Sequence, residues 1–174
     1  MLDGGIVVFD GTAGVEPQSE TVWRQAKQFG VPLVAFMNKM DKLGADFAHA
    51  VETVRDRLRA SPVPIQWPIG AEDTFRGVVD LMEWRAIVWS DEIGAQYEEV
   101  PIPEDVEVRA SEAREAMLEA IVETDDDLLE RYLEGETILP EDLRRTLRQA
   151  TIDGMLQPVL CGSALRNKGV QPLL

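Results

Sequence analysis

Two fully apolar segments with an amphipathic stretch between them constrain this chain more than any other feature. Residues 5–9 and 31–37 are rich in β-branched side chains and lack the polar alternation of a strand with one wet face. Between them, residues 17–30 place apolar side chains at helical spacing, namely Val22, Ala26 and Phe29. We expect residues 31–37 to be buried on both faces, and a strand buried in this way next to a helix is typical of parallel sheets. The sequence therefore predicts an α/β fold with a doubly wound, mostly parallel sheet.

The middle of the chain differs from both ends in charge. Residues 62–155 carry 24 acids and 8 bases, whereas residues 1–61 carry 8 acids and 7 bases and residues 156–174 carry no acid and 2 bases. A sharp shift in composition usually marks a boundary between folding units. We interpret residues 1–61 and 156–174 as one domain, interrupted at 62–155 by an inserted acidic α+β subdomain.

Within the insertion, short apolar runs separated by turn residues predict an antiparallel meander. Three helices should follow, the first of them an acidic amphipathic helix over residues 104–123. The run of three aspartates at 125–127 is interpreted as a helix cap rather than a cation site. The core of the insertion is expected to contain Trp67, Trp84 and Trp89.

Composition excludes several classes of protein. A formal net charge of −15 argues against direct binding to a nucleic-acid backbone, which requires cationic side chains. No apolar run approaches the ~20 residues of a membrane span, and one Cys with one His cannot form an internal disulfide or a Cys/His zinc cluster. We expect a protein of the cytoplasm or of an organellar matrix, without a bound metal of its own.

The clearest chemical signal is the tetrapeptide Asn38-Lys39-Met40-Asp41, directly after the second apolar run. Open α/β sheets bind ligands at the carboxyl ends of their strands. A carboxylate can accept two hydrogen bonds from the ring N–H and the exocyclic amine of guanine, an amide can serve the opposite edge or tie loops together, and a lysine stem can cover the ring. The alternative is an ordinary polar turn after a strand.

A second loop strengthens the guanine interpretation. Ser163, Ala164 and Leu165 follow another apolar strand, expected at residues 157–161. The backbone N–H of Ala164 could donate to the guanine carbonyl oxygen while Ser163 braces the loop. Alone this tripeptide would be unremarkable, but two such loops at neighbouring strand ends are more specific.

These two loops resemble the guanine-recognition motifs of P-loop GTPases, and the flanking sequence is similar to the elongation factor G family of bacteria and organelles. The similarity includes residues 10–26, 38–42, 68–70, 132–135 and 158–171 and extends over nearly the whole chain. It implies binding of GTP and GDP. Asp41 would accept hydrogen bonds from the guanine N–H groups, Asn38 would contact the other edge of the base, and Lys39 would pack on the ring. Ser163, Ala164 and Leu165 would close the pocket.

The resemblance also defines what the 174 residues lack. No Gly-x-x-x-x-Gly-Lys-Ser/Thr phosphate loop occurs in them, nor do the switch residues that hold Mg²⁺ and position the attacking water in this family. Phosphoryl transfer depends on those groups. We therefore expect these residues alone not to hydrolyse GTP, whereas the intact family couples GTP hydrolysis to tRNA and mRNA translocation on the ribosome, with Mg²⁺ as cofactor.

Two alternatives remain open from the sequence. The first is a non-enzymatic module that binds a basic partner. In the resembled family the insertion contacts the C-terminal domain of the ribosomal stalk protein, a role that would fall here to Glu112, Glu115 and Glu119. The second alternative is a related translational GTPase that acts in ribosome protection or peptide release.

Overall fold

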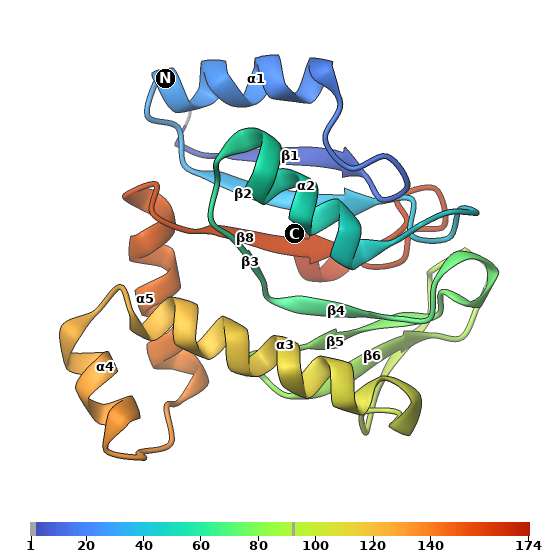
Figure 1. The fold of residues 1–174 in the computed structure, drawn as a ribbon. Helices are drawn as coiled ribbons and strands as arrows, with labels where there is room; N and C mark the ends of the chain where they lie inside the picture. Colours follow the sequence, from blue (N-terminus) through green and yellow to red (C-terminus); the bar gives the residue numbers. More distant parts are fainter. Residues whose placement is uncertain (1–2, 92) are drawn as a thin grey trace.

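The computed structural model describes residues 3–91 and 93–174, which build two four-stranded sheets (Figure 1). The first half contains β1 (Gly5–Asp10), α1 (Pro17–Gln28), β2 (Leu33–Asn38), α2 (Phe47–Leu58), β3 (Pro62–Pro64), β4 (Gln66–Ile69) and the 3₁₀ turn η1 (Glu72–Thr74). The remainder contains β5 (Gly77–Asp80), β6 (Arg85–Trp89), β7 (Tyr97–Val100), α3 (Glu104–Val122), α4 (Asp126–Leu133), α5 (Pro140–Ile152), β8 (Gln157–Cys161) and the 3₁₀ turn η2 (Gln171–Leu173).

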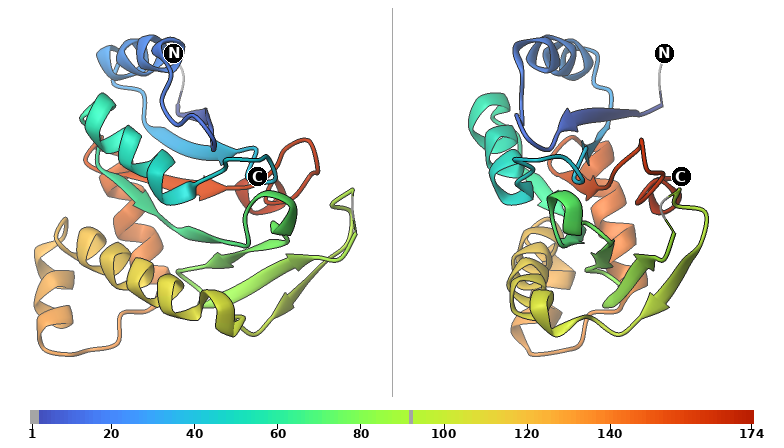
Figure 2. Two further views of the ribbon diagram at one scale, coloured as in Figure 1. Left: turned by 45° about the vertical axis from the view of Figure 1, so that its right-hand side comes forward. Right: turned by 90° about the vertical axis from the view of Figure 1, so that its right-hand side faces the viewer.

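The first sheet is wholly parallel, with the strand order β1-β2-β8-β3. Parallel crossovers are right-handed, and those through α1 and α2 move in the same direction across the sheet, so both helices lie on one face. The return to β8 runs in the opposite direction and places α5 on the other face, as Figure 2 shows. The predicted α/β architecture is therefore confirmed.

Alternate residues of β1 show which face of the parallel sheet is covered. Val7 and Phe9 are buried under α1, where Phe9 lies 6.2 Å from Trp23 between ring centroids. The expected apolar stripe of α1 was wrong in part, because Val22 and Phe29 are exposed and Trp23 carries the contact with the core. Trp23 is one position further along the helix than Val22, so it lies on the side of α1 that faces the sheet, while Val22 and Phe29 lie on the exposed side.

The second sheet is an antiparallel meander in the order β4-β5-β6-β7, as expected, although the sequence did not predict β7 as a strand. The first three residues of β7 are exposed, so its sequence lacks the apolar pattern that would have predicted a strand. Helices α3, α4 and α5 form a second core with this sheet, built on residues such as Met117, Ile121 and Leu143. Asp125 caps α4 by accepting a hydrogen bond from the N–H of Leu128 (3.0 Å), which confirms its predicted role.

Of the three tryptophans expected in the core of the insertion, Trp67 packs against that core, whereas Trp84 and Trp89 do not belong to it. Trp89 belongs to the core of the parallel sheet, and Trp67 packs edge-on against Phe47 of α2, with ring centroids 5.4 Å apart. Trp84 is 36% exposed beneath the guanidinium of Arg114, 5.3 Å from the ring centroid. Two of the three rings, those of Trp67 and Trp89, therefore contribute to the contact with the parallel-sheet domain.

The two sheets are joined where the chain passes from β3 to β4. The side chain of Gln66 on β4 is buried and accepts a hydrogen bond from the N–H of Cys161 on β8 (3.2 Å). Strand β3 pairs with β8 inside the parallel sheet, so the chain leaves that sheet after Pro64. The boundary at residues 61 and 62 stays a prediction. Among the described helices, none is both long and apolar enough to cross a membrane.

Candidate guanine-binding site

The parallel register brings the carboxyl ends of three strands together. Asp10 at the end of β1 lies opposite Asn38 at the end of β2, and Met37 lies opposite Cys161 of β8. The N–H of Gly162 donates to the carbonyl of Met37 at 3.0 Å, beyond the last residue of β8. The two predicted loops therefore begin side by side at one edge of the sheet.

The first loop turns sharply at its second residue. Lys39 has φ +66°, a left-handed conformation that costs a non-glycine residue of order 1 kcal/mol. The next residue, Met40, is fully buried, and its N–H donates to the carbonyl of Gly162 at 3.1 Å. The buried Met40 side chain and its backbone bond to the second loop thus hold the first loop in place. Asp41, the next residue, is only partly buried.

An ion pair that the sequence did not suggest fixes the end of the Lys39 side chain. Its ammonium donates to the carboxylate of Asp10, which also accepts bonds from the hydroxyl and the N–H of Thr12. Partial burial raises the pKa of Asp10, but the hydrogen bonds from Lys39 and Thr12 outweigh it and hold that pKa well below its usual range. The same hydrogen bond raises the pKa of Lys39. The Lys39 side chain is left 42% exposed, as covering a base would require.

The second loop is closed by its own backbone. Ser163 is fully buried and exchanges two backbone hydrogen bonds with Lys168, at 2.8 and 3.0 Å. This closure needs a glycine at position 162, because a Cβ there would lie 2.3 Å from the carbonyl oxygen of Lys168. The Ser163 hydroxyl accepts a hydrogen bond from the N–H of Arg166 (3.3 Å), so it braces the loop. Leu165 projects from the loop and is 88% exposed.

One side-chain hydrogen bond ties the two loops to each other. The Oδ1 atom of Asn38 accepts from the N–H of Ala164 at 2.9 Å. The sequence left open whether Asn38 contacts a base or ties loops together, and in this structure it does the second. The contact of Ala164 with a guanine carbonyl stays a prediction.

Arg166 is a member of the site that sequence reasoning missed. Its Nε donates to Oδ2 of Asp41 at 3.0 Å, and the Asp41 side chain is only 9% exposed. A carboxylate has about four lone-pair positions, so Asp41 can hold Arg166 and still accept two guanine N–H groups. The positive charge of residue 166 was visible in the sequence, but its partner 125 positions away was not.

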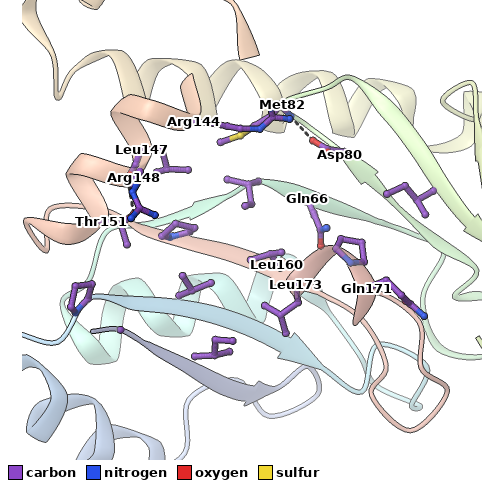
Figure 3. Close-up of a pocket in the computed structure, with 18 of the residues that line it drawn as sticks. Gln66, Asp80, Met82, Arg144, Leu147, Arg148, Thr151, Leu160, Gln171 and Leu173 are labelled. Carbon is purple, nitrogen blue, oxygen red and sulfur yellow. Dashed lines mark hydrogen bonds between the residues drawn. The ribbon is translucent and has the colours of Figure 1, made fainter. Parts of the chain in front are cut away.

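The other candidate residues and a large cavity lie elsewhere. Glu112, Glu115 and Glu119 are exposed on α3, on the insertion, and do not approach the two loops. A cavity of about 1060 Å³ lies between the two sheets and is lined in part by α5 and η2. Figure 3 shows Leu147, Leu160 and Gln171 among its lining residues. None of the six predicted guanine-binding residues lines this cavity. Size alone therefore does not identify the nucleotide site.

The described residues do not suit a divalent cation. They contain no group of three or more His, Cys, Asp or Glu side chains that could hold a metal ion. Asp10, the carboxylate at the strand ends nearest the loops, is already paired with Lys39. We derive no step through Mg²⁺ from these residues.

Comparison with known proteins agrees with this geometry. Residues 1–174 match the family described as the elongation factor Tu GTP-binding domain. The chain belongs to that family of GTP-binding domains. It is 59% identical over 174 residues to elongation factor G of Thermotoga maritima and 58% identical to that of Thermotoga petrophila. A crystal structure of a Thermus thermophilus protein superposes with a TM-score of 0.86 over 98% of the chain, at 33% identity.

The similarity concerns a part of those longer proteins. The chain spans 25% of the length of both Thermotoga relatives and 25% of the Thermus thermophilus chain. Membership of a GTP-binding domain family agrees with the chemistry that the two loops can perform. The roles of individual residues rest on the geometry above and stay predictions.

The Asp10–Lys39 pair predicts how the stability of this domain depends on pH. Because the folded-state pKa of Asp10 is depressed, the pair contributes stability that is present above the ordinary Asp value of about 3.9 and is lost as the pH falls below it. We expect Asp10→Asn to lose less stability than the wild type between about pH 5 and pH 2. Urea unfolding midpoints against pH measure this. Asp73→Asn, at an exposed position on η1, should follow the wild type, and parallel curves for Asp10→Asn and the wild type would contradict the assignment.

Proposed function

We propose that these residues recognise the guanine base of GTP and GDP within a translational GTPase of the elongation factor G type. Asp41 accepts the ring and exocyclic N–H groups of the base, and the Lys39 stem covers one ring face. The N–H of Ala164 donates to the guanine carbonyl, either in addition to its bond with Asn38 or in place of it. Ser163 and Leu165 shape the second loop. The observation that carries this proposal is the hydrogen bond of Asn38 to Ala164, which joins both loops into one site beside the Asp41 carboxylate.

The chemistry of base selection follows from that arrangement. A carboxylate beside two N–H donors of guanine forms charge-assisted hydrogen bonds, each worth about 1.5–3 kcal/mol. Adenine lacks this pair of donors, so the acceptor positions of Asp41 that are not used by Arg166 would stay unfilled. The site as proposed therefore discriminates between bases without contributing to hydrolysis.

Hydrolysis in this proposal belongs to the longer protein. The γ-phosphate and Mg²⁺ are held by a phosphate loop and switch residues outside the 174 residues, and the whole protein uses GTP hydrolysis for tRNA and mRNA translocation on the ribosome. The printed names of the Thermotoga relatives, elongation factor G, support this assignment. The 174 residues on their own bind nucleotide weakly and do not hydrolyse it.

Asp41→Asn tests the base-reading role. The variant is made in a chimera in which this chain replaces the matching 174 residues of Thermotoga maritima elongation factor G. An asparagine amide has one acceptor oxygen and one donor nitrogen. It can therefore accept from the ring N–H of xanthine and donate to its C2 carbonyl, but with guanine its NH₂ group would face the exocyclic amine, which is also a donor. We expect GTP hydrolysis at low substrate to fall by roughly ten- to a hundredfold and xanthosine triphosphate to be preferred.

The control for this experiment is Asp73→Asn in the same chimera, which removes one exposed carboxylate outside the two loops. It should keep the wild-type preference for GTP. A guanine preference that Asp41→Asn leaves unchanged would refute the assignment of Asp41.

A second candidate function rests on the acidic face of α3. Glu112, Glu115 and Glu119 are exposed, and none of them takes part in an ion pair among the described residues. Their spacing places them on neighbouring turns of one helix. Such a surface suits a basic protein partner, and we propose the C-terminal domain of the ribosomal stalk protein, with electrostatic attraction raising the association rate. This function does not require nucleotide.

Neutralising this face tests the second function. We expect the triple variant Glu112→Gln, Glu115→Gln and Glu119→Gln to weaken binding of the stalk domain to this chain and to reduce the salt dependence of the binding, measured by calorimetry at two ionic strengths. The matched control neutralises three exposed glutamates elsewhere, at Glu16, Glu98 and Glu134. Equal effects of both triple variants, or binding that salt does not change, would exclude this docking surface.

A further inference from the structure

The insertion contacts the first guanine loop through η1. The N–H of Glu72 donates to the carbonyl of Met40 at 2.9 Å, and the Glu72 carboxylate accepts from the N–H of Gly44 at 2.7 Å. Glu72 itself has φ +56°, an unfavourable conformation for a glutamate. A strained residue that bonds the loop through both its backbone and its side chain indicates that this contact is specific.

The insertion contacts the second guanine loop through the connection between β6 and β7. The carbonyl of Gly94 accepts hydrogen bonds from the side-chain amides of Asn167 (3.1 Å) and Gln171 (3.0 Å). Gly94 has φ +65°, and a Cβ at this position would lie 2.3 Å from the carbonyl oxygen of Arg166 and 2.4 Å from that of Asn167. The two backbones are therefore in contact, with no room for a side chain between them.

Both contacts lie at the same end of the insertion because of its topology. In an antiparallel meander the first and third connections fall at one end of the sheet and the second connection at the other. The β4–β5 and β6–β7 connections consequently lie beside the guanine loops, as Figures 1 and 2 show. The contacts continue into the site, since Arg166 holds Asp41 and Met40 is bonded to Gly162.

We propose that the insertion is a positioning element of the guanine site, with Glu72 holding the first loop and Gly94 the second. This rests on the proposed guanine recognition by Asp41 and Ala164. Loops held from outside lose less conformational freedom when a ligand binds, so the contacts increase guanine affinity without touching the base. By linkage, guanine binding in turn stabilises the contacts of the insertion.

Amide hydrogen exchange without nucleotide tests the positioning directly. The reporters are the amides of Met40 and Ala164, because each bonds one guanine loop to the other. Gly94→Ala should raise their exchange rates about two- to tenfold, the loss of roughly one net hydrogen bond. The matched control is Gly135→Ala, which also has positive φ (+80°) but would place its Cβ in open space. It carries the same backbone strain without the contact, so both reporters should exchange as in the wild type.

A second set of variants covers the case in which Gly94→Ala does not fold. Glu72→Ala removes the acceptor for Gly44, Glu72→Gln keeps a carbonyl oxygen in its place, and Asp73→Ala changes the exposed neighbour. We expect faster exchange of both reporters in Glu72→Ala only, at an unchanged urea midpoint of unfolding. Unchanged exchange in Glu72→Ala and Gly94→Ala, or equal acceleration in the controls, would overturn the proposal.

Titration with GDP, followed by ¹⁵N NMR, separates this proposal from the one it rests on. Glu72→Ala and Gly94→Ala should raise the apparent Kd for GDP about two- to tenfold while Glu72→Gln, Asp73→Ala and Gly135→Ala leave it near the wild-type value. If the wild-type chain and its variants show no GDP binding at all, guanine recognition fails, and the exchange rates alone still decide whether the insertion holds the loops. If GDP binds and its Kd is the same in every variant, positioning is refuted and recognition stands.

Discussion

The hydrogen bond from the Ala164 amide to Asn38 depends on the register of the parallel sheet, and the candidate site depends on that bond. A shift of one residue between β2 and β8 would turn every side chain of one strand to the other face and separate the loops. The register is held by strands buried on both faces, by the bond from Gly162 to Met37, and by the buried Gln66 that reaches from the insertion to Cys161. Packing and hydrogen bonds directly before the two loops thus determine whether the loops meet.

The sequence predicted those elements whose burial leaves a periodic signal. β2 and β8 are nearly continuous apolar runs, and α3 carries Val106, Met117 and Ile121 on its buried face. β3 was missed because three residues with two prolines do not resemble a strand, and β7 was missed because it is mostly exposed. Trp89 was assigned to the wrong core because hydrophobicity predicts burial and not the surface against which a ring is buried.

The site was predictable to the extent that it is local in sequence. Asn38, Lys39 and Asp41 lie in one tetrapeptide after a buried strand, so their chemistry could be interpreted directly. The partners of Lys39 and Asp41 could not be found in this way, because Asp10 and Arg166 reach them only through strand pairing. Ala164 was predicted in the second loop, but its hydrogen bond to Asn38 was only one of the alternatives that the sequence left open. For the same reason, the contacts of Glu72 and Gly94 with the loops became visible only in the folded chain, which shows the insertion and the nucleotide loops as one packed unit.

The central claim is that two loops at neighbouring strand ends form a single site selective for guanine. The most direct test records the ¹⁵N–¹H spectrum of the chain with millimolar GDP and, separately, with the same concentration of ADP. The account predicts that GDP shifts the amide signals of both Asp41 and Ala164 and that ADP shifts neither. Equal shifts with ADP, or a response to GDP in only one of the two loops, would contradict it.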